Sequence, residues 1–206
     1  MSRVVKAVLR ALRGQIREVG SRLHIRKMLK RNAPLFIEVG AGDKKGVNGW
    51  ITVDIAESCD VYWDLRNGIP FPNGSISKLY SSHFFEHLSF REGQAFLDEC
   101  LRVLTPVGTF SICVPNARIY VEAYLNPTAE TRKYFQHMPS YNRTTKIDYI
   151  NYMAYMSGHH KYMFDEENLI HILTHKGFRN ARLRKFDGEI DLRERDYESI
   201  YAEAEK

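Results

Sequence analysis

The fold is decided by one stretch of the sequence, Leu35-Phe36-Ile37-Glu38-Val39-Gly40-Ala41-Gly42-Asp43. A short apolar run that ends in glycines is typical of a buried strand that turns into a loop. In open α/β sheets, ligands bind where such loops leave the strands. The glycines would let a ligand lie against the backbone, although Gly-x-Gly after a strand also serves simple tight turns.

Further strands and helices alternate on the carboxyl side of this stretch. The patterns predict strands at residues 50–54, 61–63, 78–82 and 109–114. Between the last two lies a helix, which Ser89 and Glu92 open as a capping box and Pro106 with Gly108 ends. A strand, a helix and a strand in this order predict a right-handed, parallel βαβ unit.

Residues 118–158 interrupt the alternation. They contain seven tyrosines and no clean strand period, so we expect a helical insertion. A helix then begins at Asp165 and closes at Gly177, and two strands around 179–186 and 199–205 predict a final antiparallel hairpin. We expect a basic N-terminal helix or arm at residues 1–31 and one domain at 32–206 that carries the insertion.

The composition indicates a single globular domain. The chain has 206 residues, of which 44% are hydrophobic and 27% charged. Its three cysteines, Cys59, Cys100 and Cys113, form no Cys-x-x-Cys pair, which excludes a four-cysteine zinc site and suits a reducing cytoplasm. No apolar run approaches the ~20 residues that a membrane-spanning helix needs. We therefore expect a cytoplasmic protein.

The positive charge is concentrated at the N-terminus. Residues 1–31 contain ten Lys or Arg and one acidic residue, Glu18, so that this segment carries +9 and the rest −4. Apolar residues recur within it at helical spacing: Val4, Val5, Val8, Leu9, Leu12, Ile16, Val19 and Leu23. Three interpretations stay open: the helix docks this stripe on its own core, lies on the anionic inner face of a membrane, or contacts nucleic acid phosphates. The last is disfavoured because no aromatic residues interleave with the basic ones.

The chemistry centres on Glu38 and Asp54. Asp54 ends the second strand, where a carboxylate can accept both hydroxyls of an adenosine ribose, although a solvated surface charge is an alternative. The third glycine of a pyrophosphate-binding loop is missing, and Glu38 and Asp43 would repel a pyrophosphate. A ligand with a positive centre, such as S-adenosylmethionine, fits better.

Residues 36–116 resemble class I S-adenosylmethionine-dependent methyltransferases, in particular the broad family that includes ubiquinone-pathway enzymes. The resemblance is carried by EVGAGD (38–43), GWITVD (49–54), WDLRNGIPFPNGSISKLYSSHFFEHL (63–88) and LRVLTPVGTFSICVPN (101–116), with HKYMFDEENL (160–169) and YESIYAEA (197–204) further on. It implies a Rossmann-like α/β fold: a seven-stranded, mostly parallel sheet with an antiparallel last strand, helices on both faces and a helical insertion after the fifth strand. Val107 departs from the glycine that the family commonly has before Gly108.

The resemblance also implies roles for individual residues. Gly40, Ala41 and Gly42 would pack under the methionine part of the cofactor, and Glu38 would hold its ammonium. Asp54 would bind the ribose with Ile55 against the adenine, and Asp64 with Leu65 would read the adenine edge. His83 would border the sulfonium and the acceptor.

Histidines suggest two further interpretations. His83-Phe84-Phe85-Glu86-His87 fits the HxxEH pattern of zinc peptidases, and Glu86 with His87 could hold a divalent ion, but we expect no metal and a bracing role for both. His160 is a candidate catalytic base beside the acceptor pocket, and His137 is another. For each, a hydrogen-bonded loop histidine is the alternative.

These observations predict methyl transfer from S-adenosylmethionine to a small acceptor. We expect a hydroxyl of a sugar, a glycolipid or a related metabolite, because similar proteins are often linked with glycan or lipid modification and the tyrosines of the insertion could form an aromatic wall. Positioning supplies most of the rate enhancement in such a displacement. The alternative is a non-catalytic, cofactor-binding scaffold that the N-terminal helix recruits to a membrane or a partner. The sequence does not set the oligomeric state.

Overall fold

The architecture comes from a computed structural model, which describes residues 3–135 and 145–206, apart from the side chains of 3, 4 and 6–11. Seven strands form one sheet in the order β3-β2-β1-β4-β5-β7-β6. They are β1 (Phe36–Val39), β2 (Trp50–Asp54), β3 (Val61–Tyr62), β4 (Ile76–Ser82), β5 (Leu104–Pro115), β6 (Arg179–Leu183) and β7 (Ser199–Glu205). The first five are parallel, whereas β7 runs antiparallel to both β5 and β6. The expected seven-stranded, mostly parallel sheet of a Rossmann-like fold is thus confirmed.

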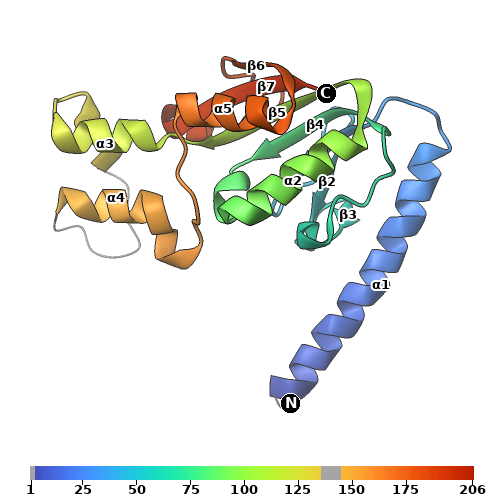
Figure 1. The fold of residues 1–206 in the computed structure, drawn as a ribbon. Helices are drawn as coiled ribbons and strands as arrows, with labels where there is room; N and C mark the ends of the chain where they lie inside the picture. The colour runs from blue at the N-terminus through green and yellow to red at the C-terminus, as the bar shows by residue number, and fades with distance from the viewer. Residues whose placement is uncertain (1–2, 136–144) are drawn as a thin grey trace.

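The helices lie around this sheet (Figure 1). The α-helices are α1 (Arg3–Leu29), α2 (Phe90–Val103), α3 (Ala117–Leu125), α4 (Lys146–Tyr155) and α5 (Glu166–Lys176). The short 3₁₀ helices are η1 (Leu65–Asn67), η2 (Phe85–His87), η3 (Thr131–Phe135), η4 (Met156–Gly158) and η5 (Arg193–Glu198). None of the described helices is long and apolar enough to cross a membrane.

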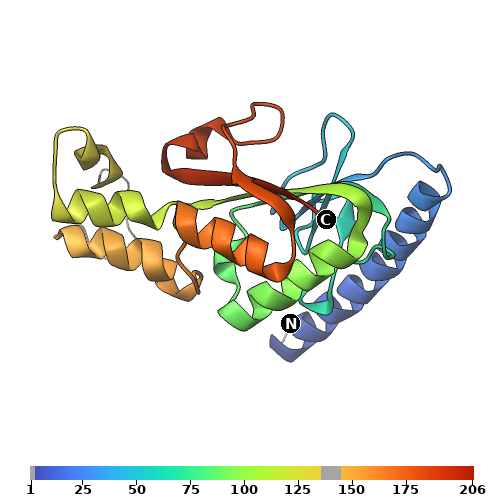
Figure 2. The ribbon, with the colours of Figure 1, turned by 45° about the horizontal axis from the view of Figure 1, so that its top comes forward.

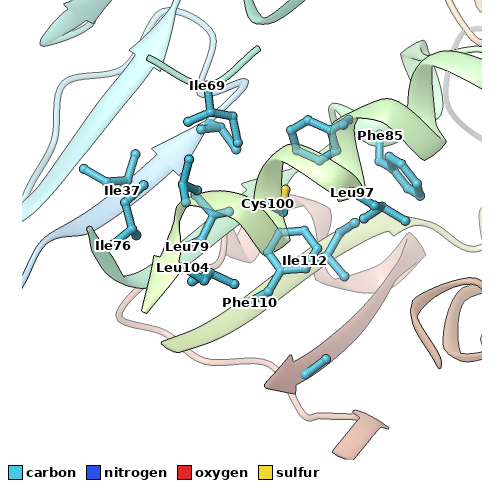
Figure 3. Close-up of a cluster of buried hydrophobic side chains, with 14 of the residues drawn as sticks. Ile37, Ile69, Ile76, Leu79, Phe85, Leu97, Cys100, Leu104, Phe110 and Ile112 are labelled. Carbon is cyan, nitrogen blue, oxygen red and sulfur yellow. The ribbon is translucent and has the colours of Figure 1, made fainter. Parts of the chain in front are cut away.

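The main core fills the space between the sheet and helices α1, α2 and α5. Figure 3 shows part of it, with Phe85, Leu97 and Cys100 packed over Leu79, Phe110 and Ile112. Alternate residues of the strands face the other side, where a smaller cluster holds Tyr80, Cys113 and Tyr201. That second face is covered by the segment between β6 and β7, through Phe186 and Ile190, rather than by a long helix.

The local signals at the start of α2 and at both ends of α5 are confirmed. The Ser89 side chain accepts a hydrogen bond from the backbone amide of Glu92, and the Glu92 side chain accepts one from the backbone amide of Ser89. The capping box of α2 is therefore complete. Asp165 caps the start of α5, and Gly177 ends that helix in the left-handed conformation.

The expected end of α2 is wrong. The helix stops at Val103 and β5 begins at once with Leu104, so that Pro106 and Gly108 lie inside the strand. The pairing of β4 with β5 shifts register between Ile76 and Lys78, at this same position. A proline is tolerated in such an irregularity because no ladder hydrogen bond from its nitrogen is needed there.

Residues 117–135 and 145–158 lie to one side of the sheet, at the end opposite α1 (Figures 1 and 2). Helices α3 and α4 pack together there around Tyr120, Tyr149 and Met153. These aromatic residues of the insertion therefore form a small core of their own. Tyr141 falls outside the described residues.

Helix α1 docks on the domain through a face other than the apolar stripe that was expected to make this contact. Ser21, Ile25 and Met28 are buried, whereas Leu12, Ile16, Val19 and Leu23 are exposed. Arg17 and Arg22 lie over the rings of Tyr62 and Trp63, with the guanidinium carbon 4.6 and 4.9 Å from the ring centroids. The helix thus attaches to the domain through Ile25 and Met28, which join the main core, and through two arginines, which can pack their planes on aromatic rings.

Candidate functional site

The loop after β1 requires its glycines. Gly40 and Gly42 have φ values of +69° and +63°, in the region that residues with a side chain rarely adopt. A side chain at Gly40 would also collide with the ring of Phe84, which packs directly on this position. The amide of Gly40 donates to the carbonyl of Val53 at 3.0 Å and holds the turn against β2. The backbone of Gly40, Ala41 and Gly42 is therefore fixed at the carboxyl end of the sheet.

Asp54 is held rigidly at the end of β2. Its Oδ2 accepts from the amide of Gly42 at 2.9 Å, and its Oδ1 accepts from the amide of Ala56 at 3.1 Å. A carboxylate has about four acceptor positions, so two remain for ligand hydroxyls. Ile55, adjacent to it, is 57% exposed and offers an apolar surface at the same edge.

Glu38 lies at the end of β1 with an ion-pair partner that the sequence does not predict. It is buried and forms a close ion pair with the ammonium of Lys44. Burial raises the pKa of Glu38, and the charge of Lys44 opposes the rise. The site therefore already holds a cationic amine against this carboxylate.

Asp64 and Leu65 follow β3 at the same end of the sheet. Asp64 caps η1 by accepting from the amide of Arg66 at 3.0 Å, and the Arg66 guanidinium bridges both carboxylate oxygens. These hydrogen bonds from the Arg66 side chain hold the pKa of Asp64 below its usual value. Leu65 packs against the main core. A ligand at Asp64 must share the carboxylate with Arg66.

Asp60 braces the loop between β1 and β2, a role that the sequence does not predict. Its Oδ2 accepts from the amide of Gly46 at 2.9 Å, the amide of Thr52 at 3.0 Å and the hydroxyl of Thr52 at 3.0 Å. Burial alone would raise the pKa of Asp60, but these hydrogen bonds lower it below its usual value. No periodicity or motif marks this residue, because its partners lie in a loop and a neighbouring strand.

His83 follows β4 in a strained conformation. Its φ is +48°, and its amide donates to the carbonyl of Cys113 at 2.9 Å. Burial lowers the pKa of His83 to about 3, with the charge of Arg195 adding to the shift. A neutral imidazole with so low a pKa is a poor proton acceptor at neutral pH, so the structure favours a positioning role over general-base catalysis.

His160 lies beside Glu86 and His87, although 73 residues separate it from His87. The amide of Lys161 donates to the carbonyl of Glu86 at 2.8 Å and joins the two segments. The rings of His87 and His160 have centroids 5.0 Å apart. Burial lowers the pKa of His160, which is enclosed here rather than open to an acceptor. His137 falls outside the described residues.

The comparisons with known proteins agree on one fold. Residues 55–112 match a family described as a methyltransferase domain. No curated protein sequence matches the chain. Solved structures match over most of it: a SAM-dependent methyltransferase from Archaeoglobus fulgidus has 17% identity and a TM-score of 0.51, with 92% of this chain and 94% of that chain covered.

Two further structures are similar. An S-adenosylmethionine-dependent methyltransferase from Mesorhizobium loti has 16% identity and a TM-score of 0.52, with 87% and 96% of the two chains covered. Phosphoethanolamine N-methyltransferase 2 from Haemonchus contortus, solved in complex with S-adenosyl-L-methionine, has 10% identity and a TM-score of 0.51, with 89% of this chain and 52% of that chain covered. These similarities leave the relation to ubiquinone-pathway enzymes a prediction. The sheet order and these structures show that the chain has the fold of S-adenosylmethionine-dependent methyltransferases, and its residues 55–112 match a methyltransferase domain.

Proposed function

We propose that the chain binds S-adenosylmethionine at the carboxyl ends of β1 and β2 and transfers its methyl group to a hydroxyl of a small acceptor. The observation that carries the proposal is the Asp54 carboxylate, fixed by the amides of Gly42 and Ala56 with acceptor positions to spare. A ribose offers two adjacent hydroxyl donors to such a group. The Haemonchus contortus structure, which has the same fold, contains S-adenosyl-L-methionine.

The charges around Glu38 support a cofactor with a positive centre. Glu38 is buried and its carboxylate is paired with the Lys44 ammonium. The ammonium of the cofactor carries the same charge and hydrogen-bonding groups as that of Lys44. We infer that Lys44 leaves Glu38 when the cofactor binds, because one buried carboxylate supports only one such partner closely.

The catalytic effect would come mainly from alignment. When bound, S-adenosylmethionine supplies a methyl group carried by a sulfonium. The thioether that leaves after methyl transfer is neutral. Phe84 and the backbone of Gly40 fix the wall of the site, and His83 is held by Ser199 at 2.9 Å. Correct orientation of reacting groups can supply about 7–11 kcal/mol at its limit. His83 would act by position, because its lowered pKa keeps it neutral.

The acceptor would lie between this site and the insertion. Tyr155, on α4, and Tyr124, on α3, are exposed at 57% and 44%. Aromatic rings pack well on the apolar faces of sugars, so we propose a sugar, a glycolipid or a related hydroxyl compound as the acceptor. Tyr120, Tyr134 and Tyr149 pack in the insertion's own core and are unavailable for this role.

Calorimetric titration with S-adenosylhomocysteine tests the cofactor site. We expect the wild-type chain to bind it and Asp54→Ala to weaken binding by at least tenfold, since two charged hydrogen bonds to the ribose are lost. The matched control is Glu57→Ala, because Glu57 is a nearby acidic residue with a side chain 92% exposed. Unchanged affinity in Asp54→Ala would refute the ribose assignment.

An acceptor screen with labelled S-adenosylmethionine separates the enzyme from the scaffold. Transfer to hydroxyl compounds supports the proposed activity. Retained cofactor binding, with no transfer to any sugar, glycolipid or related metabolite in the screen, would instead favour a cofactor-binding scaffold. The two outcomes are distinguishable because binding is measured separately.

We further propose that the outward face of α1 lies on an anionic membrane surface. Leu12, Ile16, Val19 and Leu23 are exposed by 50, 72, 58 and 53% and recur at intervals of four, three and four residues. At ~3.6 residues per turn this stripe lies opposite the buried Ser21, Ile25 and Met28. The helix therefore has one face for the domain and another apolar face for a partner.

The charge around this stripe favours lipid over other partners. The exposed Arg13 and Lys27 lie on one side of it at helical spacing, and Arg26 lies on the other. Basic residues beside an apolar stripe are typical of helices that lie in the plane of an anionic bilayer. A second copy of the chain would bring another segment of charge +9 against this one. Nucleic acid would leave the apolar stripe exposed to water.

Vesicle sedimentation tests the membrane proposal. We expect the chain to bind vesicles that contain phosphatidylglycerol and to remain free of pure phosphatidylcholine vesicles. Ile16→Glu with Leu23→Glu should weaken binding by at least tenfold, whereas Val107→Glu, at an 87% exposed position on β5, should leave it unchanged. Equal binding by the double variant, or binding to nucleic acid instead of vesicles, would overturn this assignment.

A further inference from the structure

A buried group of polar side chains lies just beyond the end of β4. Glu86 and His87 belong to η2, and His160 comes from the loop after α4. The amides of Lys161 and Tyr162 both approach the carbonyl of Glu86, at 2.8 and 3.3 Å, and fasten the two segments together. One ligand atom from each of Glu86, His87 and His160 lies within 4.8 Å of the others.

Hydrogen bonds fix the tautomers of two of the histidines. Nδ1 of His87 lies 3.1 Å from the carbonyl oxygen of His159, and Nδ1 of His160 lies 2.7 Å from the carbonyl oxygen of Met153. A carbonyl oxygen can only accept, so each Nδ1 carries the proton. In each neutral ring, Nε2 therefore presents a lone pair.

His83 adds a third lone pair. The hydroxyl of Ser199 donates its proton to the carbonyl of Arg195 at 2.6 Å. Nε2 of His83, 2.9 Å from the same hydroxyl oxygen, must therefore be the donor in that contact. Nδ1 of His83 is left with its lone pair, 3.6 Å from Oε1 of Glu86.

The carboxylate of Glu86 thus faces nitrogen lone pairs. Glu86 is 2% exposed, and its Oε1 lies 3.9 Å from Nε2 of His87 as well as near His83. Its Oε2 has no hydrogen-bond partner among the described residues. A buried carboxyl group with such neighbours needs a positive charge or a proton. One proton on Glu86 would satisfy one lone pair, whereas a cation would be bound by the carboxylate and by the lone pairs of His87 and His160 together.

We propose that Glu86, His87 and His160 bind one divalent late first-row transition metal ion. Two imidazole nitrogens and one carboxylate suit Zn²⁺ and its neighbours, whereas Mg²⁺ prefers oxygen ligands. The carbonyls of His159 and Met153 accept hydrogen bonds from the rings of His87 and His160 and so orient them. Metal-bound histidines in known sites are oriented by hydrogen bonds of the same kind. Ligand atoms around Zn²⁺ lie roughly 3.3 Å apart, so the side chains would draw closer on binding.

Metal binding can be measured without methyl transfer, so this inference stands apart from the proposed function. The chain, stripped with a chelator and freed of it, is titrated with Zn²⁺ by calorimetry, and Co²⁺ is added separately to follow its visible absorption. We expect one tight equivalent of Zn²⁺, a rise in melting temperature and a Co²⁺ spectrum typical of nitrogen and oxygen ligands. Excess Mg²⁺ should displace neither ion.

Variants of the ligands locate the ion. Glu86→Gln keeps the shape of the side chain and should lower Zn²⁺ affinity at least tenfold, as should His160→Ala. The control is the double variant His171→Ala with His175→Ala, because these two exposed rings of α5 stack at 5.8 Å and could bind Zn²⁺ themselves. This control should retain the tight equivalent.

Three results would overturn the proposal. They are a stripped wild-type chain that binds no Zn²⁺, unchanged affinity in both Glu86→Gln and His160→Ala, and loss of binding in the α5 control. Circular dichroism confirms that each variant is folded. If Glu86→Gln or His160→Ala fails to fold, His87→Ala replaces it, since the His87 side chain is 36% exposed and tolerates truncation.

Discussion

At the scale of single residues, Gly40 is constrained both by its backbone conformation and by a neighbouring ring. Its φ is +69°, which residues with a side chain rarely adopt, and a side chain there would collide with the ring of Phe84. Gly42 has a similar φ of +63°, but a side chain there would lie in open space. We expect Gly42→Ala to cost ~1 kcal/mol of unfolding free energy from backbone strain alone, and Gly40→Ala to cost about 1–3 kcal/mol more. Urea denaturation of the two variants checks this, and equal costs would contradict the packing of Phe84 on Gly40.

The sequence indicated which residues lie at the strand ends of this candidate site, but not their partners. Glycines after an apolar strand and an aspartate at the end of the next strand are local signals, and the structure brings Gly42 and Asp54 into contact. The contacts of Lys44 with Glu38 and of His160 with Glu86 are not local. Such pairs depend on how loops close over the sheet, which one sequence without relatives does not reveal.

At the scale of elements, Asp60 ties the loop after β1 to β2. Its pKa is lower in the folded chain than its usual value, so its hydrogen bonds add stability above about pH 4 that is lost as the pH falls through the folded pKa. Asp60→Asn should cost ~1 kcal/mol at pH 7 and progressively less below pH 4. Urea denaturation at several pH values, with Glu57→Gln as the control, checks the window. A cost that does not change with pH would contradict the role of the charge.

Helix α1 shows where an element was predicted but its orientation was not. The helical period was correct, and so was the alternative in which the helix contacts its own core. The residues expected at that contact were wrong, because the helix docks through Ser21, Ile25 and Met28 while arginines pack on Tyr62 and Trp63. An apolar stripe predicts that a helix has a partner surface, but it does not say which surface of the fold that is.

At the scale of the whole molecule, one buried ion pair joins the segment after β6 to the centre of the sheet. Arg184 bridges Asp191 at 2.6 and 2.8 Å, and Tyr80 of β4 donates to the same carboxylate at 2.7 Å. Asp191→Ala would leave Arg184 buried without its counter-charge, so we expect a loss of about 3–5 kcal/mol of unfolding free energy. Arg182→Ala removes an exposed pair with Glu203 and should cost under ~1 kcal/mol. Denaturation of both variants measures the contrast, and similar losses would contradict it.

The position of β7 has a consequence for how the chain acquires its shape during translation. Ser199–Glu205 lies between β5 and β6, so β6 has no place in the sheet until a later segment has been synthesised. Until then the free side of β5 presents unpaired backbone groups, in a nascent chain whose other strands can already associate. We therefore expect the ribosome-bound chain to expose the unpaired edge of β5. Chaperones that shield extended segments are expected to bind the nascent chain at this edge.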